Sequence, residues 1–188
     1  MVITKNKLIE ILKTELKSKN TLTLAIDGRC ASGKSTLGKE LSESFDCNLF
    51  HTDDYFLRPE QRTEERLNTP GGNFDIERFK EEVINGISSG ENFCYSPFDC
   101  SKMDIGDKIS VNQKALNIIE GSYSCHPEIS ENYDITVFIT TDTETQKNRI
   151  LNRNPDRAQM FFKKWIPLEE SYISHFDIKN RCDYIIET

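Results

Sequence analysis

The segment at residues 28–35 reads GRCASGKS and constrains the fold more than any other part of this chain. It matches the pattern G-x-x-x-x-G-K-[ST] at every fixed position. An apolar run at 21–27 precedes it, and a helical pattern at 33–45 begins at its end. Glycines in such a loop let backbone N–H groups turn inward around phosphate oxygens, and the N-terminus of the next helix adds positive charge. The sequence therefore predicts a strand, a phosphate-binding loop and a helix in direct succession.

The predicted loop assigns a nucleoside triphosphate and its Mg²⁺ ion to this part of the chain. Lys34 is expected to reach the β- and γ-phosphates as a mobile positive charge, and Ser35 to offer its hydroxyl to Mg²⁺. We take ATP as the phosphate donor, in contact with the loop and the first turn of its helix: Gly28, Arg29, Cys30, Ala31, Ser32, Gly33, Lys34, Ser35 and Thr36. An incidental glycine-rich turn with a surface lysine is the alternative, and the strand and helix around the loop disfavour it.

Strand-like and helical segments alternate along the chain. Strands are expected at 21–27, 47–53, 115–121, 133–141 and 182–187, and helices at 33–45, 75–90, 143–153 and 156–175, the last with a break at Pro167. Such alternation predicts an α/β fold in which helices cover both faces of a parallel sheet. Ligands of such sheets bind at the carboxyl ends of the strands, so functional residues are expected directly after them.

Acidic residues follow two of the expected strands. Asp53 and Asp54 come after the second strand, and Glu120 ends the third. Because successive residues of a strand face opposite ways, the two aspartates are expected to differ in role, with Asp54 as a helix cap. We expect Asp53 to accept the proton of an attacking hydroxyl and Glu120 to hold Mg²⁺, with Asp53 as a further candidate metal ligand. A helix cap at Asp53 and a structural ion pair at Glu120 are the alternatives.

Net charge and hydropathy restrict the partners of the chain. The 24 Lys and Arg against 31 Asp and Glu give a formal charge of −7, without the basic footprint of a duplex nucleic-acid binder. No segment has the roughly 20 apolar residues that cross a bilayer, and residues 1–20 read as an amphipathic helix rather than a secretory signal. The six cysteines form no CxxC pair, which favours free buried thiols. We expect a cytoplasmic protein with a small-molecule substrate and neither nucleic-acid nor membrane partners.

Five strings of the chain occur together in one known family. They are IDGRCASGKST at 26–36, HTDDYF at 51–56, GGNFD at 71–75, IIEGSY at 118–123, and the stretch at 142–156 that leads into FFKKWIPLEESY. In this order the chain resembles the uridine kinase family of P-loop kinases, which includes nicotinamide riboside kinases and is close to pantothenate kinase and phosphoribulokinase. The resemblance implies a P-loop NTPase with a five-stranded parallel sheet flanked by helices, in one kinase domain at 1–188 with a helical lid near 149–165.

The resemblance also implies roles for single residues. It makes Asp53 the catalytic base and gives Mg²⁺ to Ser35 and Glu120. Asp75 corresponds to the family residue that grips the ribose hydroxyls of a nucleoside. Two aromatic side chains, Tyr55 in HTDDYF and Phe98 in the stretch at 95–104, are further expected substrate contacts.

Three arginines fall where the family carries the arginines of its lid. Arg149, Arg153 and Arg157 are spaced by four residues, so they line one helix face if Pro155 does not break the turn. Guanidinium groups suit phosphate oxygens, and we expect Arg149 and Arg153 to act in catalysis beside Lys34 and Arg157 to contact the substrate. A solvated basic helix face is the alternative.

The acceptor side departs from the uridine kinase pattern. The stretch at 95–104 keeps Phe98 but has no histidine after it, and residues 57–72 are unlike the usual segment before NFD. His126, a lone histidine before a proline, is interpreted as structural. The expected activity is ATP- and Mg²⁺-dependent transfer to a hydroxyl of a small molecule, a nucleoside by resemblance, with the acceptor left open.

Other functions of phosphate-binding loops are weighed against this one. A GTPase switch requires N-K-x-D and D-x-x-G, and neither pattern occurs in the chain. A P-loop ATPase or nucleotide sensor without a small-molecule acceptor is the main alternative. A nucleotide-binding module without turnover is disfavoured because Lys34, Ser35, Asp53 and Glu120 are all present.

Overall fold

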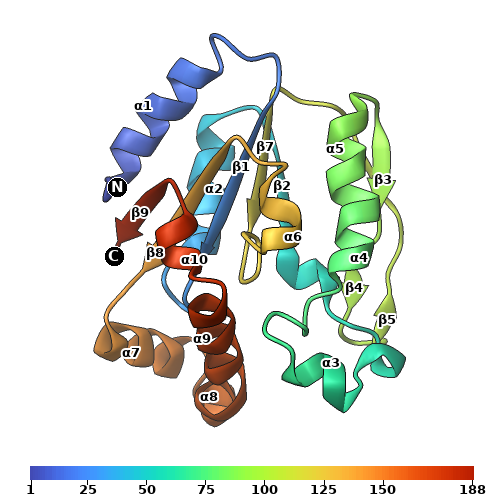
Figure 1. The fold of residues 1–188 in the computed structure, drawn as a ribbon, viewed down its shortest axis with the longest axis vertical. Helices are drawn as coiled ribbons and strands as arrows, with labels where there is room; N and C mark the ends of the chain where they lie inside the picture. Colours follow the sequence, from blue (N-terminus) through green and yellow to red (C-terminus); the bar gives the residue numbers. More distant parts are fainter.

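A computed structural model describes residues 1–188 and has a five-stranded parallel sheet at its centre (Figure 1). The strands are β1 (Leu22–Gly28), β2 (Cys47–His51), β7 (Leu116–Glu120), β8 (Ile135–Thr140) and β9 (Tyr184–Glu187), in the spatial order β2-β7-β1-β8-β9. Every neighbouring pair in this sheet is parallel. The predicted α/β fold, with a five-stranded parallel sheet flanked by helices, is confirmed.

Helices α1 (Lys5–Glu15) and α2 (Lys34–Ser44) pack on one face of the sheet. Leu8 and Leu12 of α1, with Leu37 and Leu41 of α2, are buried against strand residues that include Leu24. Residues four positions apart lie on the same side of a helix, which explains why these leucines form one core. The amphipathic pattern of the first twenty residues therefore belongs to a helix that packs on the domain.

The opposite face carries a second and larger core. Its helical elements are α4 (Ile76–Phe79), a π-helical turn at Lys80–Ile84, α5 (Asn85–Ser89), α6 (Pro127–Ser130), α9 (Ile166–His175) and α10 (Ile178–Arg181). They pack with aromatic and aliphatic side chains of the strands, among them Phe50, Ile119 and Phe138. Because both faces are covered, β1 is buried at all seven positions and its sequence is a nearly continuous apolar run.

Residues 52–115 leave the sheet after β2 and form a lobe beside it (Figure 1). The lobe contains 3-10 turns at Thr52–Tyr55 and Pro59–Gln61, α3 (Glu64–Asn68), and the helix that runs from α4 to α5. Two small antiparallel sheets complete it, β3 (Phe93–Tyr95) with β6 (Ile109–Val111), and β4 (Phe98–Asp99) with β5 (Asp104–Ile105). The helix expected at 75–90 is present and stops at Gly90, whose φ is 71°. Strands of two or three residues carry no readable periodicity, so the small sheets were not predicted.

A helical region connects β8 to β9. It consists of α7 (Thr143–Arg153), a 3-10 turn at Pro155–Arg157, α8 (Ala158–Met160), a π-helical turn at Phe161–Trp165, and α9. The kink or break expected at Pro167 is present as this π-helical turn, which directly precedes α9, and Pro167 lies in the first turn of that helix. Proline lacks an N–H and crowds the carbonyl four residues earlier, so a widened turn before it relieves both problems.

The two ends of the chain lie side by side at the outer edge of the sheet (Figure 1). Val2 bridges Ile185 of β9 in parallel. None of the helices has the length and apolar character that crossing a membrane requires. All six cysteines are free, but the expectation of buried thiols is wrong for Cys94 and Cys100, which are exposed.

Candidate active site

The loop at 28–35 bends sharply where β1 ends. Gly28, Ala31 and Gly33 have positive φ angles of 144°, 57° and 107°. A Cβ atom on Gly28 would lie 2.0 Å from the backbone oxygen of Ile139, with which Gly28 is paired in the sheet. A side chain is therefore excluded at the start of the loop, where β1 pairs with β8.

Lys34 opens α2 and folds back over the loop. Its Nζ donates to the carbonyl oxygens of Gly28 at 2.7 Å and Arg29 at 3.1 Å. The Oγ atom of Ser32 is completely buried and has no hydrogen-bond partner. A buried polar atom without a partner fits a loop that is shaped to receive a polar ligand, which here means phosphate oxygens.

Glu120 stands at the carboxyl end of β7 and is 3% exposed. One carboxylate oxygen lies 3.2 Å from Ser35 Oγ, and the other lies 2.5 Å from His51 Nδ1. This hydrogen bond raises the pKa of His51. The hydroxyl and carboxylate oxygens predicted from sequence to bind Mg²⁺ are thus brought together.

The donor set around Ser35 fits a hard cation that shares its ligands with phosphate. No group of three His, Cys, Asp or Glu side chains is arranged to hold a metal ion. Mg²⁺ commonly takes one or two protein oxygens and completes its shell with water and substrate phosphates, so Ser35 and Glu120 suffice for that mode of binding.

Asp53 lies in the 3-10 turn Thr52–Tyr55, directly after β2 ends at His51. It lies inside this turn, whose N-cap is His51, and makes no cap hydrogen bond of its own, so the helix-cap alternative is excluded. Its side chain opens into a cleft, and surrounding protein raises its pKa by desolvation, whereas the positive charges of Lys34, His51 and Arg153 act in the opposite direction. Asp53 therefore lies within electrostatic reach of the loop lysine, Glu120 and a lid arginine.

Asp53 and Asp54 do not alternate across a strand as expected, because the strand has already ended. Asp54 also makes no cap bond, and its backbone oxygen accepts from Arg78. Asp54 is therefore not a helix cap, whereas the expected difference between the two aspartates is present, because only Asp53 of the pair lines the cleft.

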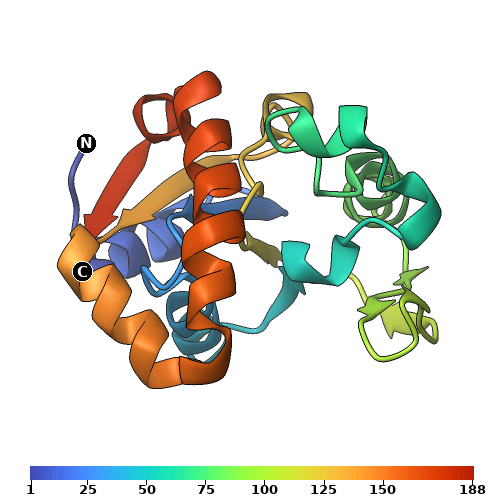
Figure 2. The same ribbon diagram turned by 90° about the horizontal axis from the view of Figure 1, so that it is seen from below.

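The cleft has a volume of about 1460 Å³ and joins the loop to the lobe and the helical region. Lys34, Ser35, Asp53, Glu120 and Phe98 all contribute to its walls. Such a volume exceeds the usual range for one small ligand, roughly 300–1,000 Å³, and is large enough for a nucleotide and a second molecule. Seen from below, α9 runs between α7 and the lobe (Figure 2).

The three predicted lid arginines also line the cleft, although a 3-10 turn separates Arg157 from the other two. Arg149 Nη1 donates to the carbonyl oxygens of Ala31 at 3.2 Å and Ser32 at 3.4 Å, so it braces the loop from outside. Arg153 lies close enough to Asp53 to lower its pKa. The Arg153 guanidinium lies 6.0 Å from the Phe161 ring centroid, and neither Arg153 nor Arg157 forms an ion pair.

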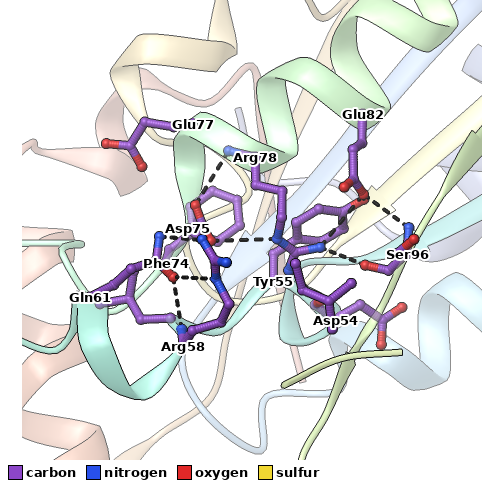
Figure 3. A network of polar contacts seen from close by, with 12 residues as sticks. Asp54, Tyr55, Arg58, Gln61, Phe74, Asp75, Glu77, Arg78, Glu82 and Ser96 are labelled. Atoms are coloured by element: carbon purple, nitrogen blue, oxygen red, sulfur yellow. Dashed lines mark hydrogen bonds and ion pairs between the residues drawn. The ribbon is translucent and has the colours of Figure 1, made fainter. Parts of the chain in front are cut away.

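Asp75 and Tyr55 are not brought into the cleft (Figure 3). Asp75 is 1% exposed, caps α4 through the N–H of Arg78, and accepts from Arg78 Nε at 3.4 Å and Gln61 Nε2 at 3.1 Å. Tyr55 is completely buried, and its hydroxyl donates to Glu82. In this structure the two side chains hold the lobe together, and contact with a substrate would require these bonds to open.

Other residues occupy the acceptor side of the cleft. Phe56, Asn73, Met103 and Tyr123 line it beside Phe98. Arg62 is a cleft residue as well, with its guanidinium 5.9 Å from the Phe98 ring. The sequence did not predict these residues. Asn73, for example, is two residues from Asp75, and nothing in the sequence indicates that Asn73 lines the cleft while Asp75 is buried behind it.

Kinases are among the solved structures that share this fold. No protein-family model and no curated protein matches the sequence. A possible uridine kinase from Bacillus stearothermophilus is similar over 96% of this chain and 99% of its own, with a TM-score of 0.68 and 19% identity. A candidate fructose transport system kinase from Silicibacter sp. TM1040 is similar over 88% of this chain and 89% of its own, with a TM-score of 0.67 and 18% identity. At these identities the likeness defines the fold, and this chain has the fold of P-loop kinases.

Proposed function

We propose that this chain is a phosphotransferase that moves the γ-phosphoryl group of ATP to a hydroxyl of a small molecule, with Mg²⁺ as cofactor. The observation that carries the proposal is the position of Asp53. A carboxylate with a raised pKa faces the same cleft as Lys34 and the phosphate-binding loop. A nucleotide sensor without turnover has no need for a base opposite the loop, whereas transfer to a hydroxyl uses a carboxylate that accepts the proton.

The proposed step forms a bond from the acceptor oxygen to the γ-phosphorus while the bond to the β–γ bridging oxygen breaks. Asp53 takes the proton of the hydroxyl, and ADP leaves. Lys34 and Arg153 offset the charge on the transferring group. Ser35 and Glu120 would hold Mg²⁺, which neutralises charge on the β- and γ-phosphates when bound.

The acceptor proposed from the resemblance is a nucleoside. Phe56, Phe98 and Tyr123 give the cleft flat apolar surfaces that suit a planar base. The possible uridine kinase from Bacillus stearothermophilus with the same fold supports this acceptor class. A ribose contact from Asp75 would have to replace its bonds to Gln61 and Arg78.

ADP release measured with and without acceptor tests the proposal. We expect release to depend on one member of a panel of nucleosides, vitamins and sugars, with a phosphorylated product visible by mass spectrometry. Equal release without any acceptor would support the alternative, a P-loop ATPase.

A matched pair of variants tests the assigned base. Asp53→Asn should lower transfer by about 10²–10⁴-fold and leave ATP affinity nearly unchanged, since a general base contributes on that order. Asp54→Asn is the control, because Asp54 does not line the cleft. Equal losses in both variants, or full activity in Asp53→Asn, would show that Asp53 is not the base.

A further inference from the structure

Helix α9 holds the phosphate-binding loop at three points. Glu169 accepts from the backbone N–H of Cys30 at 2.9 Å, Glu170 accepts from Arg29 Nε at 2.5 Å, and the Tyr172 hydroxyl donates to Asp27 at 2.8 Å. The first two contacts are made to the loop itself, and the third is made to β1 directly before the loop. The pattern G-x-x-x-x-G-K-S contains nothing that predicts them, and the partners are separated by more than 135 residues.

Glu169 differs from the other two contacts because its carboxylate faces the cleft. Its second oxygen accepts from Ser122 Oγ at 2.6 Å, two residues beyond Glu120. Burial raises the pKa of Glu169, and the positive charge of Lys34 opposes that shift, so the carboxylate lies within reach of the loop lysine. The Glu169 carboxylate therefore accepts hydrogen bonds from a loop N–H and a hydroxyl. It also lies within electrostatic reach of Lys34, the lysine expected to bind the β- and γ-phosphates.

Two of these groups, the loop N–H and the lysine, are donors that phosphate oxygens use in a loop of this kind. A loop N–H and a lysine ammonium stabilise whichever anion reaches them, be it a carboxylate or a phosphate. Two anions in that place repel each other, and the repulsion is strong where solvent is largely excluded. The terminal phosphate of a triphosphate reaches farthest toward the acceptor side, where Glu169, Ser122 and Asp53 line the cleft.

We propose that Glu169 is an internal competitor of the γ-phosphate, a positioning residue that lowers the preference of this site for triphosphate over diphosphate. The proposal rests on the proposed function in one respect, which is that ATP binds the loop. The γ-phosphate takes over the Cys30 N–H and moves Glu169 aside, while a diphosphate leaves the Glu169 contacts intact.

Helix α9 is continuous with the region expected to form the lid. A displacement of Glu169 by the γ-phosphate can therefore move that region. The π-helical turn at Phe161–Trp165 joins α9 to α8 and to the segment that carries Arg153 and Arg157. Widened turns of this kind are common at functional sites, and this one separates α9, which holds the loop, from α8 and from the 3-10 turn that bears Arg157. Displacement of Glu169 thus acts on the continuous helical segment that directly follows the turn with Arg157.

Glutamine in place of Glu169 tests the idea because it removes the charge and retains an oxygen that accepts hydrogen bonds. Dissociation constants for ADP and for a non-hydrolysable ATP analogue, both with Mg²⁺, are measured by titration calorimetry on the full chain. We expect Glu169→Gln to tighten binding of the analogue by at least about fivefold, since removal of one like charge near a phosphate has a large effect at low dielectric. ADP affinity should stay within about twofold by the same reasoning, because the diphosphate does not meet Glu169.

Glu131→Gln is the matched control, because it removes the same charge at an exposed position that does not line the cleft. It should leave the ratio of the two affinities unchanged. Equal shifts for both nucleotides in Glu169→Gln, no shift, or loss of all binding would overturn the inference and leave Glu169 as a packing contact of α9. A parent chain that binds neither nucleotide would overturn the proposed function as well, so the two failures are distinguishable.

Discussion

Replacement of Tyr172 by phenylalanine should destabilise the protein through a single buried carboxylate. Asp27 is completely buried at the end of β1 and accepts three hydrogen bonds, from Gly28 N at 2.6 Å, Cys125 N at 2.9 Å and the Tyr172 hydroxyl at 2.8 Å. The substitution removes the last donor and keeps the ring, which is 1% exposed and packed in the larger core. The loss is therefore one hydrogen bond to a buried anion, without a cavity.

The magnitude follows from the charge of the acceptor. A hydrogen bond to a charged group contributes about 1.5–3 kcal/mol, so the free energy of unfolding at pH 7 should fall by that amount. For a chain of this size each kcal/mol shifts Tm by about 2–4 °C, which predicts a Tm lower by about 3–12 °C. Urea denaturation followed by circular dichroism measures the change, with Ser171→Ala on the exposed side of α9 as control.

The loss should also depend on pH. Burial raises the pKa of Asp27, so the folded state holds a proton on this carboxyl more tightly than the unfolded chain does. Stability linked to this group is present below the unfolded pKa and is lost as the pH rises through the folded pKa. Removing the Tyr172 donor raises the folded pKa further, so the gap between variant and parent should widen as the pH rises. A variant within about 0.5 kcal/mol of the parent at pH 7, the range of neutral surface substitutions, would refute the reasoning.

Two further predictions concern a glycine and a histidine. Gly28→Ala should cost at least about 3 kcal/mol in the free energy of unfolding, because a clash with the backbone oxygen of Ile139 adds to an unfavourable φ. Gly90→Ala has open space around it and should cost about 1–2 kcal/mol, so similar losses in both variants by urea denaturation would contradict the clash. Burial lowers the pKa of His126, so the unfolded chain takes up a proton first and stability should fall as the pH drops below about 6.5. His126→Gln should flatten this fall between pH 7 and pH 5, and a slope equal to that of the parent would show that His126 is not its source.

Local patterns in the sequence identify the elements that carry the phosphate-binding loop. The apolar run of β1 is readable because a central parallel strand is buried on both faces. The loop, the start of α2 and the end of β7 follow from glycine, lysine and glutamate at positions where their chemistry is specific. Ser35 and Glu120, 85 residues apart, are expected together because both follow parallel strands, and their side chains lie 3.2 Å apart.

On the acceptor side of the cleft, the sequence does not predict which side chains line the cleft and which are buried. The resemblance to uridine kinases implies substrate contacts at Asp53, Tyr55 and Asp75, but of these only Asp53 reaches the cleft. Tyr55 and Asp75 are held in the lobe by Glu82, Gln61 and Arg78 (Figure 3). Whether a side chain faces a cleft or a core depends on which elements pack behind it, and that is not encoded in local spacing.

The sequence by itself determined the phosphate-binding loop, the parallel sheet and the residues at the strand ends, because each depends on local backbone geometry and on periodic burial. Only the tertiary structure decided that Glu169 faces the loop, that Asp75 turns away from the cleft and that Arg149 braces the loop carbonyls. These contacts join residues far apart in the chain, and many arrangements of the lobe and the helices are compatible with the same local patterns. Packing selects one of them, and with it the set of charges that a bound nucleotide meets.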